Sequence, residues 1–504
     1  MKLSRKSLHE IALTGNIETP AEKIFSLPER VIQFGSGALL RALPDYYIDE
    51  ANKAGIFNGR IVVVQSTQSI GEKSFHDQNC LYTLILKGTE TGKPFEKKII
   101  NSSISRVLSA SSNWADILKS AGNDDLRIVL SNTTERGFEM QPEKIDQQPP
   151  KSYPAKLTAF LFERFKYFNG SSESGMIIIP TELVVDNGIR LKEMVLGISD
   201  HNQLGNGFRQ WIVESNVFCN SLVDRIVPGI PSQAEHNIIE HELGYSDDLL
   251  TTAEPYGLWA IESTDPRVHK ALEFACCDGI IISDHIGRYR ELKLRILNGG
   301  HSFCCGLALL LGFTTVKEAL NDDQMGLYVR RLLTKEAAAA LDNNLVSPEE
   351  AIEFARKVVD RFENPFVDHL WTTIASQYIS KVVIRCIPML VSYYKKYSTP
   401  PEDMIFGFTS FLYYVGSSRN SACGTLPPPD EAYDTSDISG SLLLSFSDAE
   451  LWKVDLNALP GFRDQVQALI QSFISNGVQA TFRLYLDKIH PHSSIKSHSL
   501  FNIQ

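Results

Sequence analysis

The sequence lacks any long uninterrupted run of apolar residues. Its most apolar stretches, such as residues 279–282, are far too short to cross a bilayer. Residues 1–16 carry charges throughout and have no continuous apolar core, so they do not read as a signal peptide. We therefore expect a cytoplasmic protein with no membrane partner.

An excess of positive charge is also missing. The chain has 49 Lys and Arg against 60 Asp and Glu, a formal net charge of -11, and no dense basic stripe with interleaved aromatic residues. Nucleic acid is therefore not an expected partner. If the ligand is anionic, the protein must concentrate positive charge in the site itself.

Paired cysteines and clustered metal ligands are scarce as well. The eight cysteines are scattered, and the adjacent pairs Cys276-Cys277 and Cys304-Cys305 do not form a Cys-x-x-Cys motif. The histidines are dispersed, and His236-x4-His241 has no obvious third ligand. The pattern favours reduced thiols, predicts no metal site, and speaks against a metal-dependent isomerase or lyase.

What the sequence does contain is an alternation of strand and helix patterns in its first part. At 504 residues the chain is long enough for two domains. Short β-branched runs alternate with segments of helical spacing, which predicts a doubly wound α/β domain with a parallel sheet. The strand-like runs are 31–34, 61–64, 128–130, 176–179 and 280–282, and the helix-like segments include 39–54, 114–121 and 155–168.

After residue 288 the pattern becomes helical. Segments 336–341, 348–362 and 403–414 are strong helix formers, and 417–440 is rich in Gly, Pro, Ser and Asp, as in a surface loop. The sequence therefore predicts a Rossmann-like dinucleotide-binding domain over residues 1–286 and a mostly α-helical substrate domain over 287–504.

A glycine-containing turn follows the first predicted strand. Glycines at such a junction let the backbone approach a pyrophosphate at the start of the next helix. The third glycine of the usual pattern is replaced by Leu40. The residues that we predict to bind the cofactor here are Phe34, Gly35, Ser36, Gly37, Ala38, Leu39 and Arg41.

The second strand ends in Gln65, without the acid that usually holds the ribose of NAD and without an arginine for a 2′-phosphate. Local chemistry therefore leaves the choice between NAD and NADP open. Small polar residues after the strand 128–130 belong either to the cofactor crevice or to an ordinary turn, and we include four of them in the predicted cofactor site: Asn132, Thr133, Thr134 and Glu135.

A candidate catalytic trio opens the helical part. At about 100° per residue of an α-helix, Asn298 and His301 lie roughly 60° apart, and Lys293 lies about 80° from His301 on the other side. Gly299-Gly300 could bend the helix and bring the three together. Alcohol oxidation needs a base and hydrogen-bond donors for the reacting oxygen, which a desolvated lysine, an amide and an imidazole can supply. Taken singly, Lys293 is explained equally well as a solvated surface residue, and His301 as a core histidine with its hydrogen bonds satisfied.

These residues resemble a known family. The pattern Lys293-x4-Asn298-x2-His301, the turn Gly35-x-Gly37-x3-Arg41 and the run 222–228 are similar to motifs of the mannitol dehydrogenase family of polyol-specific long-chain dehydrogenases. The resemblance implies an NAD-dependent enzyme that uses a lysine acid/base without a metal. It also implies substrate contacts, for which we predict Asp224, Lys381 and Glu182.

The chain departs from the polyol enzymes of that family at two places. Thr181-Glu182-Leu183 stands where those enzymes, and the family's reductases for another hexuronate, usually have Cys-Asp-Asn, and Thr373 stands where the polyol enzymes have an arginine. Other segments resemble the family members that act on open-chain sugar acids, whose carboxylate must then meet another cation. The sequence leaves that cation open among Arg288, Arg295 and Lys381.

Three readings remain beside this one. The chain could be a reductase for a different hexuronate or a polyol dehydrogenase, although Thr181-Glu182-Leu183 speaks against both. A non-catalytic nucleotide sensor on the same fold would be expected to lose the Lys293, Asn298 and His301 trio, which is intact. The oligomeric state, monomer or small homo-oligomer, is not set by the sequence.

Overall fold

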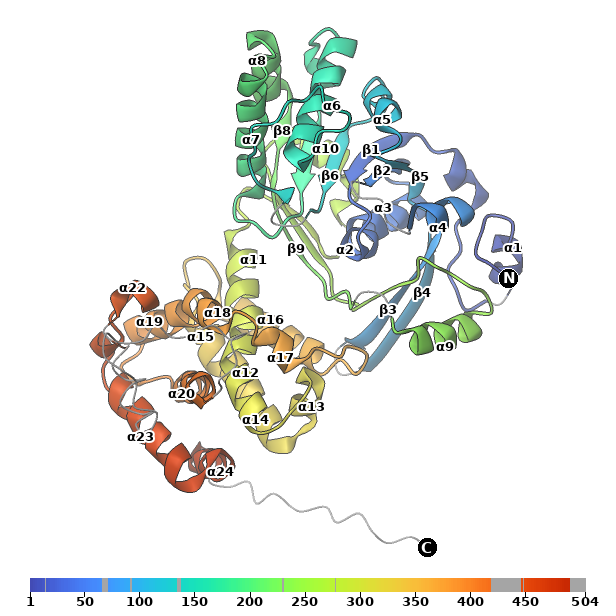
Figure 1. Cartoon of the computed structure of the whole chain (residues 1–504). Coiled ribbons are helices and arrows are strands. Elements are labelled where there is room, and N and C mark those ends of the chain that lie inside the picture. The colour runs from blue at the N-terminus through green and yellow to red at the C-terminus, as the bar shows by residue number, and fades with distance from the viewer. Residues whose placement is uncertain are drawn as a thin grey trace, which may run out of the picture. The chain divides into compact units, whose positions relative to one another are not determined.

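The computed structural model describes residues 1–13, 15–65, 71–90, 93–133, 137–228, 231–276, 278–417, 446 and 448–489. They form two compact units, Met1–Tyr289 and Arg290–Gln504 (Figure 1). The division falls at Tyr289, close to the boundary expected after residue 286. Apart from Ser417, the segment expected to be a loop, 417–440, lies outside the described residues.

The first unit is built on a parallel sheet of six strands in the order β5-β2-β1-β6-β7-β8. Its central strands are buried along almost their whole length, because helices cover both faces of the sheet. The strands are β1 (Glu29–Phe34), β2 (Arg60–Gln65), β5 (Ile104–Ser109), β6 (Ile128–Ser131), β7 (Ile177–Pro180) and β8 (Val217–Phe218).

Strand order reverses between β1 and β6. From β1 the chain builds outward through β2 to β5, then returns to the other side of β1 with β6, β7 and β8. In open sheets of this kind ligands bind at such a switch point, beyond the carboxyl ends of the strands. Phe34 ends β1 and Ser131 ends β6, and the two residues are paired in register.

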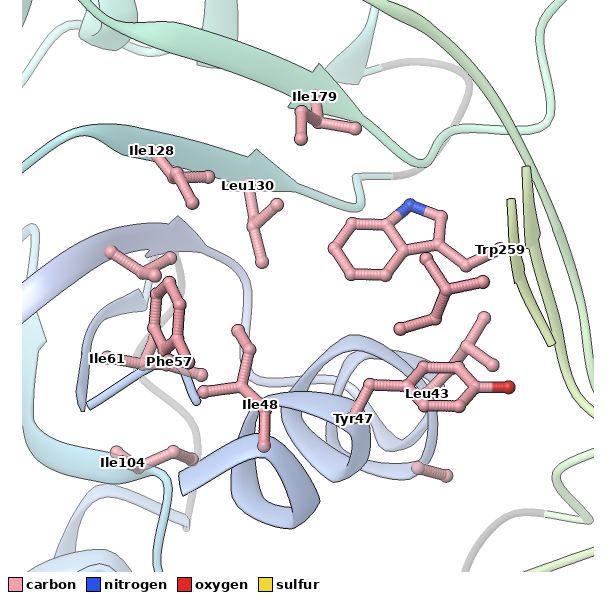
Figure 2. Close-up of a cluster of buried hydrophobic side chains, with 14 of the residues drawn as sticks. Leu43, Tyr47, Ile48, Phe57, Ile61, Ile104, Ile128, Leu130, Ile179 and Trp259 are labelled. Carbon is pink, nitrogen blue, oxygen red and sulfur yellow. The ribbon is translucent and has the colours of Figure 1, made fainter. Parts of the chain in front are cut away.

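Two apolar layers hold the helices on the sheet. Figure 2 shows Leu43 and two residues of the helix that follows it, Tyr47 and Ile48, packed toward Leu130 and Trp259. On the other face a second cluster joins the sheet to the helices α5 (Trp114–Ser120), α6 (Tyr153–Tyr167), α7 (Asn187–His201) and α8 (Asn206–Ser215).

The single helix expected over 39–54 is in fact two helices. α2 (Ala38–Ala42) ends at Leu43, which has φ -129° and ψ -80°, and α3 (Pro44–Lys53) begins at the next residue. The break falls before Pro44 because a proline disfavours the helical conformation of the residue that precedes it.

Two smaller sheets complete the first unit. One has the order β10-β3-β4 and the other β12-β11-β9, so the run 280–282 forms a strand outside the main sheet, contrary to the doubly wound pattern in which we placed it. The strands are β3 (Tyr82–Glu90), β4 (Lys93–Asn101), β9 (Asn220–Asp224), β10 (Thr251–Ala253), β11 (Leu258–Glu262) and β12 (Ile280–Ser283). The remaining α-helices are α1 (Leu8–Ala12), α4 (Gly71–Asp77), α9 (Gln233–Leu243) and α10 (Pro266–Ala271).

The second unit is mostly helical in its described residues. The helix α11 (Gly287–Glu291) leads into a π-helix, η5 (Leu292–Gly299), and then into α12 (Gly300–Leu310). A second π-helix, η6 (Leu332–Ala337), replaces the first part of the α-helix expected over 336–341. The others are α13 (Val316–Asn321), α14 (Asp323–Arg331), α15 (Ala338–Ala340), α16 (Pro348–Phe362), α17 (Trp371–Ile374), α18 (Tyr378–Arg385), α19 (Ile387–Lys396), α20 (Glu402–Ser417), α22 (Ala449–Trp452), α23 (Phe462–Asn476) and α24 (Val478–Ile489).

A helix long and apolar enough to span a bilayer does not occur in the part of the chain that the structure describes.

Candidate active site

The glycine turn lies at the sheet's switch point, directly after β1. Gly35 has φ +125°, and its N–H donates a hydrogen bond to the carbonyl of Val64 at 3.0 Å. A Cβ at Gly35 would lie 3.0 Å from the carbonyl oxygen of Asn132. Both the positive φ and this close approach to the end of β6 require glycine.

Gly37 has a different role in the same turn. It is exposed, has an ordinary φ of -63°, and precedes the first helical residue, Ala38. A Cβ built on Gly37 meets no atom within 4 Å, so the turn is open on this side. Phe34 is buried beneath it, with its ring centroid 5.3 Å from that of Tyr153. Ser36 and Leu39 are half-buried.

Polar contacts join the neighbouring strand ends to the turn. Gln65, at the end of β2, donates from Nε2 to Ser36 Oγ at 2.9 Å. Asn132 donates its backbone N–H to the carbonyl of Phe34 at 3.2 Å and its Nδ2 to the carbonyl of Thr181 at 3.0 Å. Two predicted cofactor residues, Thr134 and Glu135, lie outside the described residues.

Glu182 lies at the carboxyl end of β7, where it is buried. Its Oε1 accepts the backbone N–H of Thr133 at 2.9 Å, and its Oε2 accepts the hydroxyl of Ser131 at 3.1 Å. Burial raises the pKa of Glu182 to about 7. The side chain therefore connects the ends of β6 and β7, while the next residue, Leu183, is 69% exposed.

Two other predicted residues of the first unit are buried in its interior. Arg41 donates to the carbonyl of Leu249, and its guanidinium lies 5.4 Å from the ring centroid of Tyr82. A structural role accounts for this side chain, and its part in the cofactor site stays a prediction. Asp224 ends β9, paired in register with Leu258, and its substrate contact likewise stays a prediction.

The predicted catalytic segment of the second unit is a π-helix, not the α-helix assumed from the sequence. The hydrogen bonds of a π-helix join residues i and i+5, so residues five apart lie above one another, as residues four apart do in an α-helix. Lys293 and Asn298 are five apart and both half-buried. The π-helix thus places Lys293 and Asn298 on one face, while their convergence with His301, for which a bend at Gly299-Gly300 was expected, stays a prediction.

His301 lies in the first turn of α12, buried among rings. Its imidazole stacks on Phe362 with the centroids 4.1 Å apart, and the ring of His369 stands nearly perpendicular to it at 4.8 Å. Burial, reinforced by neighbouring basic groups, lowers the pKa of His301 well below its ordinary value, so the ring is neutral at pH 7. Its Nε2 is buried and has no hydrogen-bond partner among the described residues.

The helix α18 is fixed against this segment by reciprocal contacts. Arg295 of η5 donates to the carbonyl of Ile384, and Arg385 of α18 donates to Ser302 Oγ at 3.3 Å and to the carbonyl of Asn298 at 3.5 Å. Gly299 also lies close to the following helix, α19 (Ile387–Lys396), since a Cβ there would lie 2.9 Å from Met389 Sδ.

Lys381 lies on the same helix, one turn before Arg385. Its Nζ donates to the carbonyl of Ile374 at 2.9 Å, and burial together with Arg385 lowers the pKa of Lys381. Sequence reasoning missed Arg385 and His369. The i, i+4 spacing from Lys381 could have indicated Arg385, whereas nothing in the sequence connects His369 with His301.

Metal ligands do not gather in either unit as far as it is described: no three His, Cys, Asp or Glu side chains come together there as a candidate site.

Family models match most of the chain. Residues 29–273 match the mannitol dehydrogenase Rossmann domain, and residues 285–470 match the mannitol dehydrogenase C-terminal domain. The second match contains the π-helix and the environment of His301.

Curated relatives are similar over nearly their full length. The altronate oxidoreductase of Bacillus subtilis (strain 168) is 36% identical over 468 residues, which are 91% of this chain and 95% of that protein. The altronate oxidoreductase of Halalkalibacterium halodurans is 35% identical over 493 residues, with 93% and 95% covered.

Two solved structures share the fold. A D-sorbitol dehydrogenase in substrate-free form has a TM-score of 0.78 at 21% identity, with 96% of this chain and 100% of that chain covered. Mannitol 2-dehydrogenase of Pseudomonas fluorescens, in a ternary complex with NAD and D-mannitol, has a TM-score of 0.69 at 21% identity, with 97% and 100% covered.

Proposed function

The chain belongs to the mannitol dehydrogenase family, and from that premise we propose that it interconverts D-tagaturonate and D-altronate with NAD(H). The full-length similarity to altronate oxidoreductases supports this substrate over a polyol. Thr181-Glu182-Leu183 supports it too, since the segment departs from the pattern of the polyol enzymes.

The first unit has the features of an NAD site. Gly35 keeps the turn tight against Asn132, and Gly37 leaves its outer side open, as the approach of a pyrophosphate requires. In this proposal Gly35 to Ala38 hold the pyrophosphate, and Gln65 and Asn132 border the cofactor. When bound, NAD supplies the acceptor or donor of the hydride.

The second unit supplies the proton chemistry. Lys293 Nζ takes the hydroxyl proton of altronate during oxidation and returns it to the carbonyl oxygen of tagaturonate during reduction. Asn298 donates to the reacting oxygen from the same face of η5. His301 is the second donor, since a neutral imidazole carries one N–H. No metal ion takes part in this mechanism.

One observation carries the proposal: the π-helix brings Lys293 and Asn298 to one face, immediately before a buried, neutral His301 whose Nε2 has no partner among the described residues. A buried polar atom left without a hydrogen bond is costly, so a substrate oxygen that hydrogen-bonds to His301 would be favoured there.

The test is NADH oxidation with a panel of keto substrates: D-tagaturonate, D-fructuronate and D-fructose. We expect the highest kcat/KM with D-tagaturonate and D-altronate as its product. A higher kcat/KM with D-fructuronate or D-fructose would reassign the substrate within the family. No oxidation of NADH with any of the three would contradict the proposed activity.

A further inference from the structure

We propose that His369 and Lys381 form the subsite for the substrate carboxylate, so that these two side chains select a sugar acid over a neutral sugar. The inference rests on the proposed function and adds to it the group that recognises the acid.

The first step is the position of His369 beside the candidate catalytic histidine. Phe362 lies against one side of the His301 ring, and His369 approaches it edge-on at 4.8 Å. His301 is buried, whereas His369 is half-buried. A ligand whose oxygen meets His301 therefore has the imidazole of His369 as its neighbour.

The second step is the charge around this pair. Burial is the main cause of the lowered pKa of both histidines; among the basic groups that add to it, Arg385 and Lys381 act on His301, and Lys381 acts on His369. Lys381 and Arg385 have no ion-pair partner in the described parts of the chain, and His369, whose lowered pKa leaves its ring neutral, can add an N–H donor. Positive charge held in a partly buried place without a carboxylate is unfavourable, unless an anion from outside completes it.

The third step compares Lys381 with two other cations near the candidate site, Arg295 and Arg385. Arg295, which the sequence left open, donates to Glu291 Oε2 at 2.9 Å and to the carbonyl of Ile384, so its charge is already balanced. Arg385 is directed to Ser302 Oγ and the carbonyl of Asn298. Among the described residues, Lys381 uses one of the three donors of its ammonium group, on the carbonyl of Ile374, and retains two.

The chemistry fits a carboxylate at a distance from the reacting carbon. In an open-chain ketohexuronate the carboxylate and the carbonyl group lie toward opposite ends of the carbon chain. A carboxylate can accept from the ammonium group of Lys381 with one oxygen and from the imidazole N–H of His369 with the other. These contacts exist in substrate and transition state alike, so their loss should weaken binding more than turnover.

The experiment compares His369→Gln and Lys381→Gln with wild type in steady-state reduction of D-tagaturonate by NADH. Each change should raise KM roughly 10- to 100-fold, as expected for losing a hydrogen bond to a charged group, with kcat within about threefold. Lys381→Arg keeps a cation and should retain most of the affinity. Lys395→Gln, an exposed lysine of α19, is the matched control and should leave both constants unchanged.

A neutral substrate gives the decisive contrast. D-Tagatose has a hydroxymethyl group in place of the carboxylate. The ratio of kcat/KM for D-tagaturonate to kcat/KM for D-tagatose should therefore be smaller in the variants than in wild type. Variants that lose kcat instead of affinity, or that keep the full preference, would overturn the subsite. A wild-type enzyme that is inactive on D-tagaturonate would instead contradict the proposed function.

Discussion

Gln65 and Ser36 are joined by a hydrogen bond of 2.9 Å from Nε2 to Oγ, which fastens the end of β2 to the glycine turn after β1. Gln65 stands where an acid would hold the ribose hydroxyls of NAD, and it is buried. Its side chain is neutral, so it can neither repel the 2′-phosphate of NADP nor pair with it.

Cofactor preference should reflect this neutral side chain. We expect kcat/KM to be higher with NADH than with NADPH, but by a smaller factor than an aspartate in place of Gln65 would produce. Gln65→Glu has nearly the same shape and adds a negative charge, so it should lower kcat/KM with NADPH and leave that with NADH within about threefold. Equal efficiency of wild type with both cofactors would contradict the assignment of NAD.

The two glycines of the turn should respond differently to substitution. A side chain at Gly37 meets open space, so Gly37→Val should fold with nearly unchanged thermal stability but bind NADH at least about tenfold more weakly, about 1.4 kcal/mol. Fluorescence titration with NADH and a thermal melt measure the two effects. Unchanged affinity for NADH in Gly37→Val would show that the pyrophosphate does not approach this turn.

Gly35→Ala is the counterpart of that variant. Because Gly35 has φ +125° and lies against Asn132, alanine there should destabilise the fold itself, by about 1–3 kcal/mol. A normal free energy of unfolding for Gly35→Ala would show that the turn relaxes.

Glu182 should make stability depend on pH. Its folded-state pKa of about 7 lies above the ordinary value of 4.5, so between these limits the folded state holds a proton that the unfolded state has released. The free energy of unfolding therefore decreases as pH rises from about 4.5 to 7, by at most about 3 kcal/mol.

Glu182→Gln removes this titration. Its melting temperature should decline less than that of wild type over the same pH range, measured by calorimetry in matched buffers. Glu193→Gln, at an exposed position of α7, is the control and should follow wild type. Parallel curves for wild type and Glu182→Gln would mean that Glu182 is ionised throughout.

The fold could be predicted from the sequence where one local pattern decides the structure. The runs before Gly35 and Gln65 are near-continuous apolar strands, and residues 348–362 have helical spacing from end to end; the structure has these elements. The prediction that the run 280–282 belongs to the main sheet was wrong, because the apolar pattern of a strand does not indicate which sheet the strand joins. Pro44 is a local signal for the break at Leu43, but the helical spacing of residues 39–54 led to the prediction of a single helix.

The sequence proposes catalytic residues for the candidate site, whose roles stay predictions, but it does not indicate their geometry. Lys293, Asn298 and His301 stand out as residue types in a pattern, yet their angular positions depend on a π-helix that propensity does not indicate. The environment of His301 comes from Phe362 and His369, some sixty residues further along the chain, which only tertiary packing brings to it. Long-range packing of this kind leaves no periodic trace in a single sequence.

The role of Lys293 can be tested by the pH profile of altronate oxidation in wild type and Lys293→Ala. Removing a general base should lower kcat by roughly 10²–10⁴-fold while NAD binding survives. Wild type should show a limb that rises as a single group loses its proton, and the variant should lack that limb. Lys335→Ala, an exposed lysine in the other π-helix, should keep both turnover and limb. A Lys293→Ala enzyme with near-normal kcat and an intact limb would contradict the assignment of Lys293 as the acid/base.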